Sequence, residues 1–219
     1  MKRRVLTAIV IAPAVVLFVS MLWIASSTYA RAPRLVAEVE RAHPFPLSPA
    51  ELPKSRLCPL LVVQDRTFFR HQGIGLTDGP PGHTTLTQGV GKHLFFRQYK
   101  PGLVGKIRLM ISAWAFDRRI SKEKQLDIFL NRAYFGTFDG QSVNGFAAAA
   151  SKFYGKDFRD LTDREFASIL AMLDAPNRYD PLRHPEVNAE RTRRIEQSVR
   201  RACREGCFTG PQPVPCSGA

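Results

Sequence analysis

The apolar residues are arranged differently at the N-terminus and in the rest of the chain. After the basic residues Lys2–Arg4, a mostly apolar stretch runs from Val5 to Ile24, about 20 residues and long enough to cross a bilayer as a helix. A cleavable signal peptide has a shorter apolar core and a small-x-small cleavage site, which Thr28–Ala30 resembles poorly. We therefore predict an uncleaved anchor, with its basic tip in the cytoplasm and the chain from about residue 31 outside.

The remaining apolar residues recur mainly at helical spacing. The clearest examples are 126–133, which follows Ser121, and 166–173, which follows the capping box Thr162–Glu165. No segment alternates apolar and polar residues over a sustained stretch, so we predict a mainly α domain. Further helices are expected at 108–120, which is apolar almost all round, at 147–154 before Gly155, and at 186–204.

Composition divides the chain into four parts, and its length suits one membrane segment with one globular domain. The predicted parts are the tip and anchor at 1–30, a Pro-broken connector at 31–57, the helical domain at 58–204, and a tail rich in Cys, Pro and Gly at 205–219.

The net charge of +13 suggests anionic partners. Three of the positive charges and no acidic residue precede residue 31, so the exported part carries +10. Anionic lipid headgroups and phosphate-bearing substrates would attract such a domain. Nucleic acid is the other common partner of a strongly basic domain. The predicted anchor and the absence of a recognisable nucleic-acid-binding motif argue against it.

The cysteines of an exported domain can form disulfides. Cys203 and Cys207 are one helical turn apart, but no His or Asp nearby completes a zinc site. We predict that disulfides hold the C-terminal region and that no metal is bound there, and the pairing stays open. The four cysteines are Cys58, Cys203, Cys207 and Cys216.

The run Gln64-Asp65-Arg66-Thr67-Phe68-Phe69-Arg70-His71-Gln72-Gly73 resembles a signature of the family-51 glycosyltransferases, Glu-Asp-x-x-Phe-x-x-His-x-Gly. These bacterial enzymes polymerise peptidoglycan glycan strands from lipid II. The resemblance implies a lysozyme-like, mainly helical domain. It also places Gln64 at the position of the general base. A side-chain amide cannot accept a proton near neutral pH.

A second stretch, Gly82-His83-Thr84-Thr85-Leu86-Thr87-Gln88-Gly89, is similar to the family pattern Gly-x-Ser-Thr-x-Thr-Gln-Gln. Its hydroxyls and amide suit the binding of sugar and phosphate oxygens. Lys92 follows at the spacing of a lysine that contacts phosphate in the family. Without the resemblance, the threonines would only cap a helix and Lys92 would be a solvated residue.

The family's third signature, Arg-Lys-x-x-Glu, is only partly present, at Gly105–Leu109. Lys106 is retained, Arg108 stands where a basic residue is common, and Leu109 occupies the position of a second glutamate. In the family that glutamate is thought to position or protonate the diphosphate leaving group, and leucine can do neither. Lys106 and Arg108 can still hold a diphosphate through charge-assisted hydrogen bonds.

The fourth signature, Lys-x-x-x-Leu-x-x-Tyr-Leu-Asn, resembles Lys122–Asn131, and the resemblance as a whole covers about residues 58–200. By analogy Asp65 is structural, with replacement of the lost base as its alternative role, and His71 stabilises the first motif. His43, His83, His93 and His184 are interpreted as surface or capping residues. The predicted substrate-binding residues are His71, Thr84, Thr85, Gln88, Lys92, Lys106 and Arg108.

Two functional hypotheses follow from the resemblance. One is a weak or altered peptidoglycan glycosyltransferase that transfers a glycan from undecaprenyl diphosphate to lipid II. The other is a non-catalytic protein that binds lipid-linked glycan or acts as a scaffold for cell-wall synthases. A lysozyme-like hydrolase would also need an acid at Gln64. The expected location is the bacterial inner membrane, and a divalent cation, Mg or Mn, is the expected cofactor at the substrate diphosphate.

Overall fold

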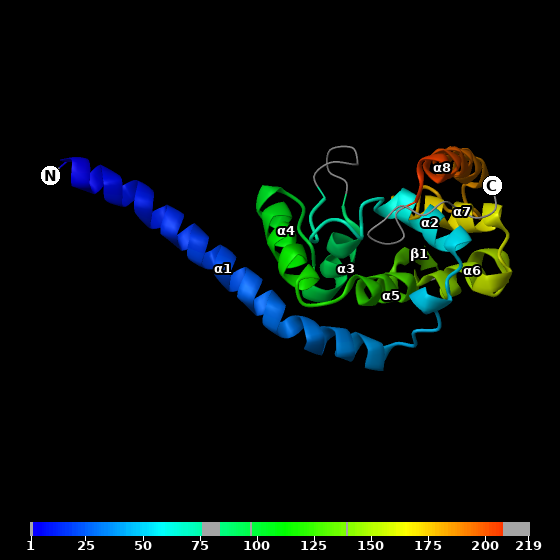
Figure 1. Ribbon diagram of the computed structural model, residues 1–219, viewed down its shortest axis with the longest axis horizontal. Helices are drawn as coiled ribbons and strands as arrows, with labels where there is room; N and C mark the ends of the chain where they lie inside the picture. Colours follow the sequence, from blue (N-terminus) through cyan, green and yellow to red (C-terminus); the bar gives the residue numbers. More distant parts are fainter. Residues whose placement is uncertain (1, 76–83, 97, 139, 208–219) are drawn as a thin grey trace.

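The computed structural model describes residues 2–75, 84–96, 98–138 and 140–207. One long helix leaves a body of shorter helices (Figure 1), which confirms the predicted mainly helical fold. The elements are α1 (Lys2–Ala42), η1 (Pro49–Glu51), α2 (Lys54–Gln64), α3 (Leu86–Phe95), α4 (Leu103–Asp117), α5 (Lys122–Arg132), β1 (Tyr134–Phe138), β2 (Gln141–Asn144), α6 (Phe146–Tyr154), η2 (Phe158–Asp160), α7 (Asp163–Ala171) and α8 (Pro185–Glu205).

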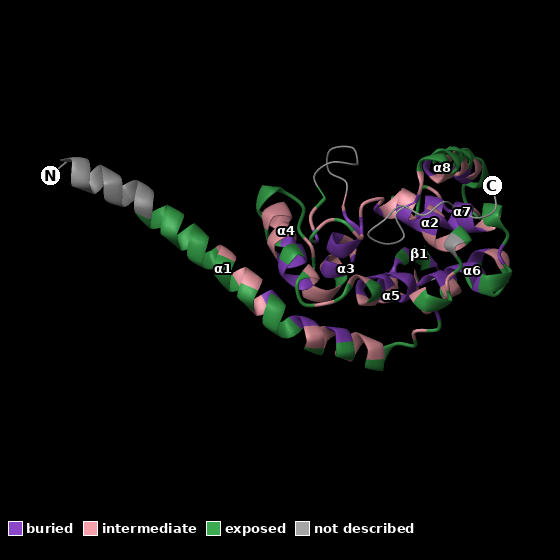
Figure 2. Cartoon of the chain, in the orientation of Figure 1, coloured by how far each residue is buried: buried purple, intermediate pink, exposed green. Residues whose placement is uncertain are grey.

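Helix α1 has two parts with different surroundings. Its segment from Ala12 onward is long and apolar enough to cross a membrane, and large apolar side chains such as Phe18 and Trp23 are exposed there. Further along, Ala32 and Val36 are buried. Figure 2 shows this change from exposed to partly buried residues along the helix. The structure therefore contains the helix expected of a membrane anchor, and the same helix also packs on the body.

The predicted connector is wrong over residues 31–42, because α1 continues through Pro33 to Ala42. A proline inside a helix removes one backbone hydrogen bond, but here burial of Ala32 and Val36 offsets that loss. Thr28 on α1 also donates a hydrogen bond to Ser112 on α4, over 3.4 Å. The contact between α1 and the body thus decides the length of the helix.

Three predicted helix-end signals agree with the structure, whereas the helix expected at 108–120 runs from Leu103 to Asp117. Ser121 accepts a hydrogen bond from the Lys124 amide at the start of α5, and Thr162 and Glu165 form the complete capping box of α7. Gly155 ends α6 in the left-handed conformation, with φ of 62°. These local signals were sufficient because each acts within one turn of the helix end.

The antiparallel pair β1–β2 was not predicted. Its strands have five and four residues, too short to show sustained alternation. Gly145 follows with φ of 85°, and a Cβ there would lie 2.5 Å from the Asn131 carbonyl oxygen of α5. The hairpin therefore returns the chain tightly onto α5. Beyond it, Phe146 forms the centre of an aromatic core with Phe135, Phe158 and Phe166.

A disulfide joins Cys58 on α2 to Cys207, just beyond α8. It confirms that a disulfide holds the C-terminal region, and the pair spans 149 residues of sequence. The Cys203 sulfur lies 4.0 Å from that of Cys58. Cys216 lies outside the described residues.

We expect the double variant Cys58→Ser/Cys207→Ser to lose about 2–5 kcal/mol of unfolding free energy, since the bond closes a long loop in the unfolded chain. Replacing both residues leaves no unpaired partner of this bond. Denaturant unfolding with and without reductant measures the change. Under reducing conditions, the wild type and the variant should have nearly the same unfolding free energy. Equal unfolding free energies under oxidising conditions would contradict the prediction.

Candidate functional site

A cavity of about 450 Å³ lies where α1, α3, α5 and the segment after α7 meet. It draws residues from parts of the chain far apart in sequence. Figure 2 shows α3 and α5, which contribute much of its wall, with many buried residues. The lining residues are Val39, Gln64, Thr84, Gly89, Val90, Lys92, His93, Leu94, Ile128, Phe129, Arg132, Ala133, Tyr134, Leu173, Asp174 and Pro176.

Three of the predicted site residues meet on this wall through Thr84. The Gln64 side-chain amide donates to the Thr84 carbonyl oxygen over 3.4 Å, and the Lys92 ammonium donates to the Thr84 hydroxyl over 3.3 Å. Gln64 ends α2 and Lys92 lies on α3, so Thr84 joins the first two sequence motifs. An amide, a hydroxyl and an ammonium group therefore face one cavity.

Lys92 is partly buried and lies near a second cation. Burial lowers its pKa, and the positive charge of Lys106 lowers it further. The ammonium also lies over the Tyr99 ring, 5.0 Å from its centre, while the Arg108 guanidinium lies 5.8 Å from the centre of the Phe96 ring. Lys106 and Arg108 do not line the cavity, but Lys106 is close enough to repel Lys92. An anion bound beside these residues would relieve that repulsion.

The cavity contains polar residues that the sequence analysis missed. Arg132 and Asp174 line it, and so does His93, which was interpreted as a surface or capping residue. Burial, followed by the charges of Arg132 and Lys92, lowers the pKa of His93. Arg132 directly follows the fourth motif, so its position next to that motif could have marked it as a candidate site residue. Asp174 is the one carboxylate among the lining residues, and Arg191 on α8 binds it.

Asp65 and His71 form a buried hydrogen-bond network away from the cavity wall. One Asp65 carboxylate oxygen accepts from His71 Nε2 over 2.8 Å and from the Leu86 amide over 2.9 Å. The Gly73 amide donates to His71 Nδ1 over 3.0 Å, which places the ring proton on Nε2. This geometry supports a structural role for both side chains and gives none to Asp65 as a substitute base.

Thr85 and Gln88 also lie outside the cavity lining. The Thr85 hydroxyl caps α3 by accepting from the Gln88 amide over 3.1 Å and donates to the Gly73 carbonyl over 2.9 Å. The Gln88 side chain is buried, and its Oε1 has no hydrogen-bond partner in the described part of the chain. The second motif therefore divides into Thr84, which faces the cavity, and residues that hold the first motif against α3.

Leu109, at the predicted second acid position, is fully buried in α4. It does not line the cavity. A leucine gains free energy from leaving water, so its interior position follows from its chemistry. No proton-transfer group comes from this position.

A buried polar network lies behind the site. The Thr87 hydroxyl donates to the Gln125 side-chain oxygen over 2.7 Å, and the Gln125 amide donates to Asp117 over 3.0 Å. Lys122 pairs with Asp117, and its ammonium lies 4.6 Å from the centre of the Phe68 ring. The network thus ties the first, second and fourth motifs together and fixes α3 against α5.

The lining residues do not fit a divalent cation of their own. Hard cations require several oxygen ligands, and the cavity offers one carboxylate beside Lys92 and Arg132. Within the described residues, no group of three or more His, Cys, Asp or Glu side chains could hold a metal ion. These lining residues alone would therefore not hold the Mg or Mn expected at the substrate diphosphate.

Residues 33–200 match the family described as transglycosylase. Among curated relatives, penicillin-binding protein 1F of Bacillus subtilis is 33% identical over 169 residues, 71% of this chain and 23% of the relative. Penicillin-binding protein 1B of Vibrio cholerae is 29% identical over 175 residues, 73% of this chain and 22% of the relative. Penicillin-binding protein 1A of Pseudomonas aeruginosa is 28% identical over 176 residues, 74% of this chain and 21% of the relative. This chain therefore spans less than a quarter of these relatives, and its lysozyme-like helical domain belongs to the family-51 glycosyltransferases, the transglycosylases.

Proposed function

We propose that this protein binds lipid II at the cavity and is a peptidoglycan glycosyltransferase with strongly reduced glycan transfer. Membership of the transglycosylase family supports the substrate. The observation that carries the proposal is the convergence of Gln64, Thr84 and Lys92 on one wall. This wall offers cationic and hydrogen-bonding groups for a diphosphate sugar, but no proton acceptor at Gln64.

The cationic residues are arranged to hold the diphosphate. Lys92 faces the cavity, and its lowered pKa reflects both burial and the nearby charge of Lys106. A bound diphosphate would accept charge-assisted hydrogen bonds from Lys92 and Lys106, with Arg108 supplying a two-pronged donor beside them. Arg132 adds a further cation to the cavity wall.

The reaction requires one proton transfer that this chain performs poorly. The acceptor's 4-hydroxyl oxygen forms a bond to the donor sugar's anomeric carbon, whose bond to the diphosphate oxygen breaks. The diphosphate leaves with that electron pair, and the hydroxyl proton must pass to a base. Gln64 can accept a hydrogen bond from the hydroxyl but cannot take its proton. Loss of a general base typically slows such a step by about 10²–10⁴-fold.

The anchor completes the proposed arrangement. We place α1 across the bacterial inner membrane in a single pass, with the basic tip in the cytoplasm and the helical domain outside. The apolar stretch of α1 supports this placement, as does the basic cluster Lys2–Arg4.

The binding site is tested with the triple variant Lys92→Gln/Lys106→Gln/Arg108→Gln. Charge-assisted hydrogen bonds contribute about 1.5–3 kcal/mol each, so we expect lipid II to bind at least about 100-fold more weakly. The assay is titration of labelled lipid II into the full chain reconstituted in neutral-lipid nanodiscs.

A matched control removes the same charge elsewhere, through Lys152→Gln/Arg164→Gln/Arg178→Gln, three exposed residues on other elements. It should bind lipid II as the wild type does. Equal affinity of the wild type and the cavity variant would refute the assignment of the phosphate-binding residues.

The second hypothesis is a non-catalytic protein that binds lipid-linked glycan or positions a cell-wall synthase. The full burial of Leu109 favours it, because the predicted second acid position then contributes nothing to the cavity. Reconstituted wild type that binds lipid II and forms no glycan product over long incubation would select this function. Measurable product would select the weak transferase.

A further inference from the structure

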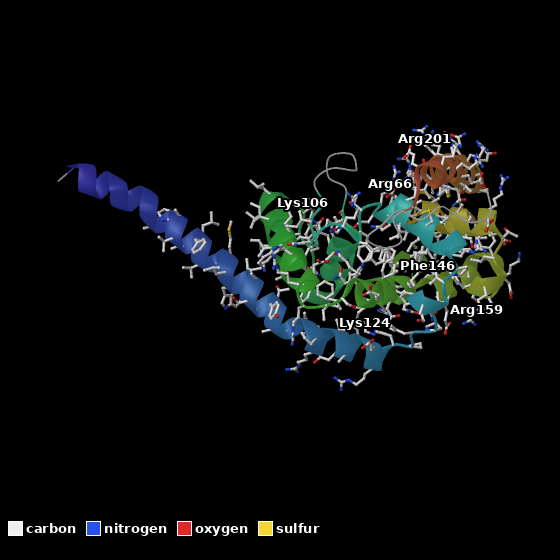
Figure 3. The ribbon with its side chains drawn as sticks, in the orientation of Figure 1. Arg66, Lys106, Lys124, Phe146, Arg159 and Arg201 are labelled. Carbon is white, nitrogen blue, oxygen red and sulfur yellow. A yellow bond between two sulfur atoms is a disulfide. The ribbon has the colours of Figure 1, made fainter. Side chains whose placement is uncertain are left out.

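The face of α8 opposite its buried side exposes a row of arginines. The buried side carries Ile195 and Ala202. Arg193, Arg200 and Arg204 are exposed and, at 3.6 residues per turn, lie within roughly 40° of one line along the helix. We name these three residues the α8 arginine row. Figure 3 shows Arg201, their neighbour, on the outer side of α8 and directed away from the body.

Two acidic residues of α8 are engaged by other arginines, while Glu196, between Arg193 and Arg200, forms no ion pair in the described parts of the chain. Glu190 pairs with Arg194, and Glu205 pairs with Arg66. No residue of the α8 arginine row forms an ion pair within the described parts of the chain. The pKa of Glu205 is lowered first by its hydrogen bond from Arg66 and the charge of that group, and also by Arg201 and Arg204. The C-terminal half of α8 thus carries more positive than negative charge.

Both ends of α8 are fixed to the body. Near the start, the Asn188 side chain donates to the Ser168 carbonyl over 3.0 Å and to the Tyr179 carbonyl over 2.6 Å. Just beyond the end, Cys207 is disulfide-bonded to Cys58. The helix backbone that carries the arginine row is therefore already ordered, which lowers the entropic cost of binding.

The row matches an extended anion better than a compact one. Along the helix its members are separated by about 10 Å and about 6 Å, too far apart for one phosphate group to bridge. All basic residues of α8 are arginines, and the planar guanidinium binds phosphate oxygens in pairs. Successive phosphates of a linear polymer could each meet one guanidinium.

The position of α8 identifies the compartment of the partner. Figure 1 shows α8 at the end of the body remote from the N-terminus of α1. With α1 as the anchor, α8 lies far from the bilayer, so lipid headgroups do not reach it. We propose that the α8 arginine row binds an extended phosphodiester-linked polymer outside the membrane.

The test uses the full chain in nanodiscs of neutral lipid and labelled poly(glycerol phosphate) of defined length. The variant Arg193→Gln/Arg200→Gln/Arg204→Gln should bind this probe at least about 10-fold more weakly at about 0.1 M salt. The slope of log affinity against log salt should fall in magnitude by about 2, since each lost phosphate contact removes about 0.7.

A matched variant distinguishes binding by the α8 arginine row from a general effect of net positive charge. The control Arg119→Gln/Arg164→Gln/Arg178→Gln removes the same charge from exposed positions off α8 and should leave probe affinity nearly unchanged. Equal losses in both variants, or no binding by the wild type, would overturn the proposal. Polyglutamate of equal charge binding as tightly as the phosphate polymer would also overturn it, in favour of an acidic protein. Lipid II binding by the row variant should stay at the wild-type level, which keeps this test independent of the proposed function.

Discussion

Replacing Gln64 by glutamate is expected to raise the rate of lipid II polymerisation by about 10²-fold or more. The side chain keeps its size, loses its long hydrogen bond to the Thr84 carbonyl, and gains a carboxylate able to take the acceptor's hydroxyl proton. Lys92, which binds the same Thr84, lies in a region of surplus positive charge, so a carboxylate there is electrostatically favourable. The rate is measured with labelled lipid II and the reconstituted full chain, by the amount of glycan product.

The matched control is Gln64→Met, which keeps the length of the side chain without a proton acceptor and should produce no gain. A Gln64→Glu protein that binds lipid II normally and stays as slow as the wild type would refute the missing base as the cause. Adding Leu109→Glu is not expected to help. Leu109 is fully buried, and an ionised side chain at such a position destabilises the fold.

The variant Asp65→Ala is expected to lose about 3–5 kcal/mol of unfolding free energy. Its carboxylate accepts two buried hydrogen bonds, from His71 and from the Leu86 amide. Removing it leaves both donors without this acceptor, and hydrogen bonds to charged groups contribute about 1.5–3 kcal/mol each. Denaturant unfolding followed by circular dichroism measures the loss.

Asp163→Ala serves as the comparison, because Asp163 pairs with Arg56 but its side chain is 91% exposed. Because the carboxylate is exposed to solvent, we expect this pair to contribute about 0–1 kcal/mol. An Asp65→Ala protein that stays as stable as the wild type but loses its residual polymerisation would reverse the conclusion and make Asp65 the substitute base.

Local sequence signals were sufficient for much of the fold. Ser121 and Thr162 marked helix starts because a capping side chain acts within one turn of its own helix. The continuation of α1 through Pro33 was not predictable in this way. It depends on burial against a body assembled from residues much later in the chain. The hairpin β1–β2 was missed because its strands are too short to establish a period.

The site was predictable only where a motif carried the information. Gln64, Thr84 and Lys92 belong to motifs, and the structure brings them to one cavity. Asp174 had no motif of its own, and its place on the wall depends on how the chain after α7 returns to α3. The third signature also could not show that Leu109 is buried. A match to a sequence motif does not say which face of α4 packs against the body.

The continuity of α1 has a mechanical consequence. The same helix carries the apolar stretch that ends near Ile24 and, further along, Val39 on the cavity wall. Fifteen residues of helix separate these points by about 22 Å, with no loop between them to vary the distance. With α1 placed across the membrane as proposed, the helix holds the cavity at a set height above the bilayer surface. The length of the proposed lipid-linked substrate between its membrane-embedded chain and its sugar would then be a condition of entry.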